Sequence, residues 1–353
     1  MKEMRLIMLG FGDAGRAFAR LIEEKKKEIA EEYGYIIKVV AVTTKSRGSL
    51  FNEKGIELLR AVKEIEEMGV FNKEDESFSE ISSLEAVSSV DYDVMVELTP
   101  LDIFTGQPAK EHISIALGRG KHVITANKGP LAWAYSELKK KADEKRVQFL
   151  FETTVMDGSP VFNLMKETLP LCKVTEIKGI LNSTTNYILE EMAKGKEYNE
   201  ILEEGKSMGF VEADPAMDIE GWDAAAKITT LMNVLMEANI TPMDIQRKGI
   251  ENITYDEIKE ADARGKVIKL LCHAKLENGK PVGKVSPELI PKGDLLAGIT
   301  GTTSVVSITT DLMKTITIVE HDPDIEQTAY GPFVDLLRIL KLGSGRHTHQ
   351  LSD

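Results

Sequence analysis

Apolar and polar residues alternate in blocks along the first third of the chain, and these blocks predict strands separated by helices. Three short apolar runs are typical of buried strands: 5–9, 36–43 and 92–98. Three further segments mix apolar and charged residues with the spacing of amphipathic helices: 16–32, 53–68 and 108–119. Strands that alternate with helices indicate a doubly wound parallel sheet, so the first domain is predicted to be α/β.

The first predicted strand and helix are joined by a glycine-rich turn. It has the pattern G-x-G-x-x-G, formed by Gly10, Gly12 and Gly15, with Asp13 and Ala14 before the last glycine. Gly10 allows a tight turn, Gly12 lets the backbone approach a pyrophosphate, and Gly15 lets the helix lie close to the strand. Because a strand precedes the pattern and a helix follows it, a Rossmann-type dinucleotide site is favoured over a purely structural turn. All five residues are expected cofactor contacts.

The end of the second predicted strand bears on the choice of cofactor. A site that prefers NAD usually has Asp or Glu there, to bind the ribose 2′-hydroxyl. This chain has Thr43, followed by Lys45 and Arg47. The two cations favour the 2′-phosphate of NADP, with NAD as the second choice. The alternative is that both are solvated loop charges.

Polar residues also follow the next two predicted strands. Thr99 and Pro100 come after the third, and Asn127 and Lys128 after a short strand that begins near His122. In parallel sheets of this type, ligands bind at the carboxyl ends of the strands, so these residues are expected at the cofactor edge. Lys128 alone is interpreted either as a cation in the cleft or as an ordinary turn lysine.

The central stretch 179–231 concentrates charge beside apolar residues and is predicted to form the active site. A span of sixteen positions contains Glu212, Asp214, Asp218, Asp223 and Lys227. Burying a charge costs free energy unless the charge is paired or takes part in function. A cluster of charges beside apolar residues therefore indicates a functional site. Asp218 is expected to be the N-cap of a helix that begins at Ile219. Asp223 and Lys227, four apart, then share one face of that helix, unless they form an ordinary exposed ion pair.

Composition narrows the classes of protein that the chain can represent. Its 353 residues suggest two or three domains, and its net charge of −13 argues against nucleic acid or an anionic membrane as the main partner. No apolar run reaches the length of a membrane span. Cys172 and Cys272 provide neither a disulfide framework nor a metal-ligand spacing. A cytoplasmic protein is therefore expected.

Five segments, in order and across most of the chain, resemble homoserine dehydrogenase: GFGDAGRAFARL, VELTP, TANKGPLA, GILNSTTNYILEEMAKG and GFVEADPAMDIEGWDAAAK. The resemblance implies NAD(P)-dependent, reversible interconversion of L-homoserine and L-aspartate 4-semialdehyde. It also assigns roles: Lys227 matches the catalytic lysine, and Asp223 matches the aspartate near the reacting oxygen. Glu212 and Asp218 match acidic residues of the substrate site, and Lys128 matches the lysine of the cofactor-side loop.

The implied reaction agrees with these residue types. Oxidising the alcohol carbon of homoserine requires a group that accepts the hydroxyl proton, and the reverse reaction requires a donor. A lysine kept from bulk water can have its pKa lowered toward neutrality, but the adjacent Asp223 opposes this. The proton route is therefore left open between Lys227 and Lys128. Glu212, with Asp218, is expected to hold the substrate ammonium.

Two segments depart from the family pattern. The family has a monovalent-cation site that maps to four positions: Glu152, Val155, Asp157 and Ser159. Relatives usually have a glycine-rich turn here, but this chain reads MDGSP at 156–160. Near the C-terminus, a G-x-G-A-G turn typical of the family is replaced by EHDPDIEQ at 320–327. The closing contact over the nicotinamide is therefore expected to be altered.

The expected architecture has two parts. The cofactor-binding domain is 1–134, with the segment 325–353 returning to it, and the substrate-binding, catalytic and dimerisation domain is 135–324. Strands at 147–152, 174–180 and 302–319 are expected to build a mixed sheet in the second domain. The resemblance also implies a homodimer. Two alternatives are a dinucleotide-binding sensor without turnover and a different semialdehyde oxidoreductase that uses Cys172 or Cys272 as a nucleophile.

Overall fold

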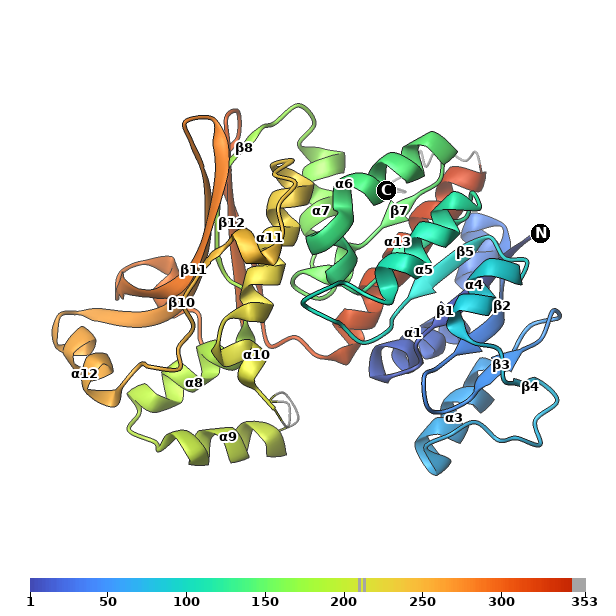
Figure 1. Cartoon of the computed structure of the whole chain (residues 1–353), viewed down its shortest axis with the longest axis horizontal. Coiled ribbons are helices and arrows are strands. Elements are labelled where there is room, and N and C mark those ends of the chain that lie inside the picture. The colour runs from blue at the N-terminus through green and yellow to red at the C-terminus, as the bar shows by residue number, and fades with distance from the viewer. Residues whose placement is uncertain (209–210, 212–213, 345–353) are drawn as a thin grey trace.

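The computed structural model describes residues 1–208, 211 and 214–344, and its β-strands form two sheets near the two ends of the long molecular axis (Figure 1). Glu212, which the sequence places in the substrate site, lies outside the described residues. The predicted fold class is confirmed, because one sheet is mainly parallel and the other is mixed.

Within the described residues, the first sheet has seven strands in the order β4-β3-β2-β1-β5-β6-β7. The five strands from β2 to β7 in this order are parallel, and β3 and β4 are antiparallel at one edge. The strands are β1 Lys2–Leu9, β2 Tyr35–Thr43, β3 Ser49–Phe51, β4 Phe78–Ser79, β5 Val94–Glu97, β6 His122–Thr125 and β7 Phe149–Leu150.

Helices cover both faces of this sheet, because alternate residues of the central strands are apolar on both sides. Leu6 and Met8 of β1 pack in one core, and Ile7 and Leu9 pack in the other. The first core also contains residues of α1 (Asp13–Glu24), α3 (Leu58–Met68) and α13 (Ile325–Ser344), and the second contains residues of α4 (Ser83–Ser89), α5 (Ala109–Gly118) and α6 (Gly129–Lys145). The short helices α2 (Lys26–Glu28) and η1 (Ile29–Tyr33) lead from α1 to β2.

The chain returns to the first sheet at its C-terminal end. Helix α13, red in Figure 1, packs on α1, and its residues Phe333 and Leu336 are buried in the same core as Phe18 and Ile22. Its first turns also contact the segment 152–158, where a Cβ on Gly158 would lie 2.4 Å from the carbonyl oxygen of Gln327. Helix α13 therefore joins the cofactor side to the segment that follows β7.

The second sheet has the order β13-β12-β8-β10-β11-β9 in the part of the chain that is described. Its strands are β8 Val174–Ile180, β9 Gln246–Arg247, β10 Lys266–Glu277, β11 Lys280–Pro291, β12 Ser304–Thr310 and β13 Lys314–Glu320. Helices α8 (Ser183–Ala193), α11 (Trp222–Leu235) and α12 (Tyr255–Ala263) pack on β10. The other elements are η2 Glu152–Thr154, α7 Val161–Asn163, η3 Leu164–Thr168, α9 Tyr198–Ser207, α10 Ala216–Ile219, η4 Pro242–Asp244 and η5 Leu295–Gly298.

One predicted strand was assigned to the wrong sheet. The segment 147–152 was expected in the second sheet, but its strand β7 pairs in parallel with β6 of the first. Its two residues, Phe149 and Leu150, are buried on opposite faces, which suits an edge strand that α6 covers on one face and α13 on the other. The predicted strand at 302–319 is a hairpin of β12 and β13, which turns between Thr310 and Lys314.

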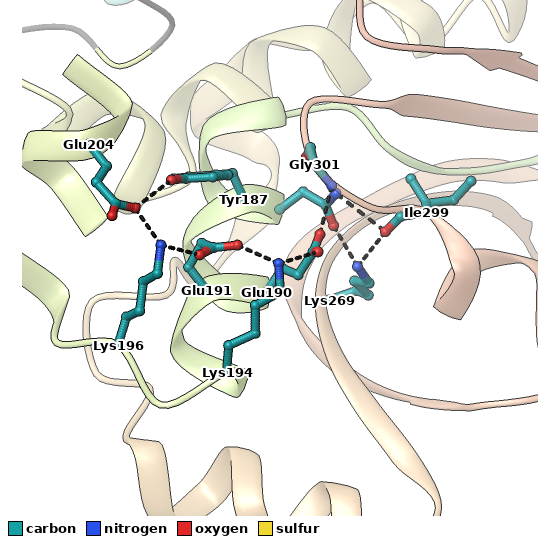
Figure 2. Close-up of polar contacts among 10 residues, drawn as sticks. Tyr187, Glu190, Glu191, Lys194, Lys196, Glu204, Lys269, Ile299 and Gly301 are labelled. Carbon is teal, nitrogen blue, oxygen red and sulfur yellow. Dashed lines mark hydrogen bonds and ion pairs between the residues drawn. The ribbon is translucent and has the colours of Figure 1, made fainter. Parts of the chain in front are cut away.

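Ion pairs fix the end of α8 that lies far from the predicted site, as Figure 2 shows. Lys194 lies between Glu190 and Glu191, and Lys196 bridges Glu191 (2.8 Å) to Glu204 of α9 (2.6 Å). Glu190 also accepts a hydrogen bond of 2.7 Å from the backbone N–H of Gly301. Helix α8 is thus held at its C-terminal end, and its N-terminal end reaches the central polar cluster.

Candidate active site

Two lysines and one aspartate meet where the first sheet approaches helix α11. Lys128, at the start of α6, lies 3.2 Å from one carboxylate oxygen of Asp223, and Lys227 lies 3.1 Å from the other. The exposed fractions of the Lys128, Asp223 and Lys227 side chains are 18%, 15% and 21%. Lys227 also donates a hydrogen bond of 2.7 Å to the carbonyl oxygen of Leu181. The i,i+4 pair of Asp223 and Lys227 therefore forms a largely buried triad with Lys128. It is not the exposed ion pair that was considered as the alternative.

Asn182 connects this triad to Asp218, although no individual role was predicted for Asn182 from the sequence. Its side-chain amide donates to Asp218 at 2.6 Å and to Asp223 at 3.0 Å. Its amide oxygen accepts the N–H of Thr185, so Asn182 is the N-cap of α8. An Asn just before a helix that starts with Ser-Thr-Thr is a recognisable capping signal, but its contacts with Asp218 and Asp223, 36 and 41 positions away, are tertiary.

The predicted capping role of Asp218 is wrong. Asp218 lies inside the short helix α10, and the N-cap of α11 is Gly221, which has a positive φ of 79°. Glycine adopts this left-handed conformation without the strain that a Cβ brings, so the chain can turn sharply between the two helices. The turn leaves the Asp218 side chain to bond Asn182 in the cluster.

The charges of the triad shift one another's pKa values. Burial acts to raise the pKa of Asp223, but Lys227 and Lys128 outweigh it and hold that pKa below its ordinary value. Burial acts to lower the pKa of Lys227, but Asp223 and Asp157 outweigh it and raise that pKa. Lys227 is therefore an ammonium at neutral pH, and Asp223 prevents the lowering toward neutrality that burial alone favours. Burial, with the Asp223 charge, raises the pKa of Asp218.

The glycine-rich turn has the geometry that its sequence predicts. Gly10 has a φ of 98°, and a Cβ there would lie 2.3 Å from the carbonyl oxygen of Leu98. A Cβ on Gly15 would lie 3.0 Å from the Gly10 carbonyl oxygen, whereas a Cβ on Gly12 would meet nothing within 4 Å. The space beside Gly12 at the start of α1 fits the close approach of a pyrophosphate.

The other expected cofactor contacts surround this turn. The Gly10 N–H donates to the carbonyl oxygen of Thr43, so the loop with Lys45 and Arg47 begins beside the glycines. Asn127 donates to the carbonyl oxygens of Thr99 (3.0 Å) and Pro100 (3.3 Å). The structure therefore brings the ends of β1, β2, β5 and β6 to one edge of the sheet, and the assignment of these residues to a cofactor stays a prediction.

An aromatic contact joins the loop after β5 to the start of helix α11. Phe104, in the loop after β5, lies edge-on to Trp222, with ring centroids 5.2 Å apart and an interplanar angle of 74°. The guanidinium of Arg247, a residue of β9 in the second sheet, lies 3.7 Å from the Trp222 ring. Trp222 directly precedes Asp223, so this contact and the Lys128–Asp223 ion pair link the same two regions.

The segment expected to hold a monovalent cation lies between β7 and α7. The Glu152 carboxylate is buried and accepts the N–H groups of Phe162 and Asn163, both at 2.8 Å. Burial, with the Asp335 charge, raises the pKa of Glu152 to about 7. Each carboxylate oxygen keeps a second lone pair, which suits a hard cation. No group of three or more His, Cys, Asp or Glu side chains that could hold a metal ion occurs among the described residues, so the cation site stays a prediction.

The turn within this segment places two non-glycine residues in the left-handed conformation. Met156 and Asp157 have positive φ angles of 59° and 43°. Non-glycine residues seldom adopt this conformation, and they keep it where the surroundings hold them. Here the Thr328 hydroxyl of α13 donates to Asp157 at 2.7 Å, which fixes the turn and the Asp157 carboxylate that acts on Lys227.

Glu320 is a charged residue of this region that no sequence motif indicated. It ends β13, its exposed fraction is 8%, and its Oε2 has no hydrogen-bond partner within the described residues. Burial, with the Asp157 charge, raises its pKa to about 7. Glu320 lines a cavity of about 390 Å³ together with Gly158, Ser159, His321, Glu326, Gln327 and Tyr330.

The environment of Cys272 is unsuitable for a nucleophile. Its thiol is fully buried and lies 3.7 Å from the carbonyl oxygen of Ala224. Burial raises the pKa of Cys272 to about 12, so the thiolate is scarce at neutral pH. Cys172 is half-buried.

None of the helices in residues 1–208, 211 and 214–344 has the length and hydropathy to cross a membrane.

Comparison with known proteins supplies the same family for both parts of the chain. Residues 10–152 match the family model of the homoserine dehydrogenase NAD-binding domain, and residues 160–337 match the homoserine dehydrogenase model. A homoserine dehydrogenase from Methanocaldococcus jannaschii is 40% identical over 95% of this chain and 98% of its own length. An NAD(+)-dependent homoserine dehydrogenase from Pseudomonas canavaninivorans is 32% identical over 99% of this chain and 100% of its own length.

Solved structures of homoserine dehydrogenases have the same fold as this chain. A homoserine dehydrogenase from Thiobacillus denitrificans superposes with a TM-score of 0.81 at 28% identity, covering 100% of this chain and 76% of its own. A hyperthermophilic archaeal homoserine dehydrogenase in complex with NADPH also gives 0.81, at 27% identity, covering 96% of this chain and 97% of its own.

Proposed function

The chain belongs to the homoserine dehydrogenase family, and we propose that the family reaction takes place at the cluster of Lys128, Asp223 and Lys227. The protein is an NAD(P)-dependent oxidoreductase that interconverts L-homoserine and L-aspartate 4-semialdehyde. One observation supports this location above the others: Asp223 pairs at 3.2 and 3.1 Å with two lysines, one at the start of α6 and one in α11.

Lys227 is proposed as the group that exchanges the proton with the reacting oxygen. The nicotinamide cofactor donates or accepts the hydride. Because Asp223 and Asp157 raise its pKa, Lys227 is ready to donate a proton to the aldehyde oxygen during reduction. During oxidation of homoserine, the same ammonium must first lose a proton, so this direction is expected to speed up as the pH rises.

Asp218 is proposed to contact the substrate ammonium, together with Glu212. Asn182 donates to one Asp218 oxygen and leaves acceptor capacity on the carboxylate. Burial raises the pKa of Asp218, which means that its charged form lacks full compensation in the ligand-free protein. A cationic ligand group provides that compensation.

The loop with Lys45 and Arg47 is proposed to set the cofactor preference. The double variant Lys45→Ala, Arg47→Ala is expected to raise the KM for NADP by about 10- to 100-fold, because charge-assisted hydrogen bonds to a phosphate contribute about 1.5–3 kcal/mol. The KM for NAD is expected to stay within about twofold. Steady-state kinetics with both cofactors measure the difference, and Lys27→Ala, an exposed lysine of α2, is the matched control. Equal changes for both cofactors would contradict a phosphate contact.

The contact between Phe104 and Trp222 is proposed to align the loop after β5 with helix α11. Phe104→Ala is expected to raise the KM for the cofactor by about three- to tenfold, since an aromatic pair contributes about 0.5–1.5 kcal/mol. Tryptophan emission reports the same change, because Trp222 is one of only two tryptophans in the chain. Phe104→Leu keeps an apolar contact and is expected to recover part of the loss. Unchanged kinetics in Phe104→Ala would show that the contact has no role in alignment.

The assignment is tested directly with the purified protein. Absorbance of the reduced nicotinamide is followed with L-homoserine and NADP, and then with NAD. Homoserine-dependent reduction is the expected result. Dinucleotide binding without reduction by either cofactor would leave the protein as a sensor of the same fold and refute the catalytic assignment.

We propose four further features of the protein on the basis of its membership of the family. They are the homodimer, a cytoplasmic location, the division near residue 134 into a cofactor-binding and a catalytic domain, and a monovalent cation at Glu152, Val155, Asp157 and Ser159. Light scattering, limited proteolysis and activity in sodium, potassium and caesium buffers test the first, third and fourth of these.

A further inference from the structure

Glu320 is a buried acid with an unused hydrogen-bonding oxygen. It lies at the end of β13, where the chain leaves the second sheet to begin α13. Its exposed fraction is 8%, and its Oε2 has no partner within the described residues. Leaving a buried acceptor unsatisfied costs about 1–3 kcal/mol, and more for a charged group. Such an atom in a native protein requires an explanation, of which a missing ligand is one.

The surroundings of Glu320 connect it to the active site. The cavity of about 390 Å³ that it lines opens between the end of β13, the turn at 158–159 and the first turns of α13. The charges of Asp157 and Lys227 both act on Glu320, and Asp157 also acts on Lys227. Glu320 therefore belongs to the same electrostatic environment as the proposed catalytic lysine.

The chain's own residues satisfy only part of the hydrogen-bonding and charge-pairing capacity of the Glu320 carboxylate. The Ser159 side chain acts on the Glu320 carboxyl and partly lowers its pKa, but Oε2 has no hydrogen-bond partner and no lysine or arginine forms an ion pair with Glu320 in the described structure. The charged groups that act on Lys227 and Asp223, together with Glu320, include more carboxyl than ammonium groups: Asp157, Asp218, Asp223 and Glu320 against Lys128 and Lys227. A buried region of this charge favours a ligand group that is cationic or donates N–H bonds.

We propose that Glu320 is a ligand-binding residue of this protein, whose Oε2 accepts an N–H from the bound substrate or cofactor. Two ligand groups share this chemistry: the α-ammonium of the amino-acid substrate and the carboxamide of the oxidised nicotinamide. The inference rests on the proposed function in that it takes these two ligands as the occupants.

The experiment measures binding and not turnover, so it remains informative even if the catalytic assignment fails. Isothermal calorimetry gives the Kd of L-homoserine and of NADP for the wild-type protein, Glu320→Gln and Glu320→Ala. Glu326→Gln is the matched control, because Glu326 lines the same cavity but is exposed. Thermal unfolding of each ligand-free protein separates a binding role from a structural one.

The expected result is a Kd for one ligand that rises about 10-fold or more in Glu320→Ala, with the other ligand and Glu326→Gln within about twofold. The ligand-free thermal midpoint is expected to stay equal or rise, because an unsatisfied buried carboxyl has been removed. If homoserine is the affected ligand, Glu320→Gln is expected to lose affinity as well, because the amide cannot pair with an ammonium as a charge. If NADP is affected, Glu320→Gln is expected to keep most of the affinity, because its amide oxygen still accepts a carboxamide N–H.

Two results would overturn the proposal. One is an unchanged Kd for both ligands in Glu320→Ala. The other is a change only in the dependence on sodium or potassium, which would assign the free oxygen to a cation and not to an N–H donor. Failure of the wild-type protein to reduce NADP with homoserine, with binding intact, would refute the proposed function and leave the Glu320 contact to be decided by the same titrations.

Discussion

Replacing Lys227 with alanine is expected to lower kcat for homoserine oxidation by at least about 100-fold, and by up to about 10⁴-fold, which is the range that a positioned acid or base contributes. The Kd for NADP is expected to stay within about twofold, because the cofactor edge of the first sheet does not depend on this side chain. The loss is expected to appear in both directions of the reaction, since the same group accepts the proton in one and donates it in the other. Stopped-flow or steady-state absorbance of the reduced nicotinamide measures the rates.

The structure indicates that this variant folds. Without Lys227, the buried Asp223 keeps Lys128 at 3.2 Å and the Asn182 amide at 3.0 Å, so its charge retains partners. Lys227→Met keeps most of the side-chain volume and separates loss of the ammonium from loss of packing. Lys139→Ala removes a lysine from an exposed i,i+4 pair of α6 and is expected to leave kcat unchanged. Near-normal turnover in Lys227→Met would rule out Lys227 as the proton-transfer group.

Lys128→Ala decides between the two lysines that the sequence left open. Lys128 lies 3.2 Å from the Asp223 oxygen that Lys227 does not contact, so the two ammonium groups flank one carboxylate. If Lys227 carries the proton, Lys128→Ala is expected to raise the KM more than it lowers kcat. A loss of kcat in Lys128→Ala as large as that in Lys227→Met would assign the proton to both residues acting together.

The sequence predicts the parts of this protein that depend on local periodicity. The alternation of Leu6 and Met8 with Ile7 and Leu9 predicts a strand buried on both faces, and the structure has one. The spacing of Asp223 and Lys227 predicts a pair on one helical face, which the structure also has. In both cases the relevant neighbours are within four residues, so the chain's own geometry determines the contact.

Features that depend on distant segments were missed or misplaced. Strand β7 is two residues long, and its position is set by α6 on one face and α13, almost two hundred residues later, on the other. Asp218 has the residue type of an N-cap, but the positive φ of Gly221 places the helix start three residues later. Glu320 has no local motif at all. Its importance depends on a cavity whose other walls come from 158–159 and from α13.

Replacing Asp223 with asparagine is expected to change both the pH dependence of catalysis and the stability of the fold. Asp223 is the largest influence that raises the pKa of Lys227, so its charge keeps the ammonium protonated. Without that charge, burial and the nearby Lys128 both favour the neutral amine, and the pKa of Lys227 is expected to fall. The rise of kcat with pH in the oxidation direction is therefore expected to move to lower pH. A profile of kcat from pH 6 to 10 in both proteins measures the shift.

The stability loss at neutral pH is expected to be about 3–5 kcal/mol, the range for removing one partner of a buried ion pair. The pKa of Asp223 is lowered in the folded protein, so its contribution is present above the unfolded value near 3.8 and is lost as the pH falls toward and below the folded value. The difference in the free energy of unfolding between wild type and Asp223→Asn is therefore expected to be large at pH 7 and to shrink in strong acid.

Asp143→Asn is the matched control, because Asp143 forms an exposed i,i+4 pair with Lys139, and such pairs contribute only about 0.3–0.5 kcal/mol. Urea unfolding at several pH values compares the three proteins. If Asp223→Asn were no less stable than Asp143→Asn at pH 7, and its pH profile matched wild type, Asp223 would not be the counter-ion that governs Lys227.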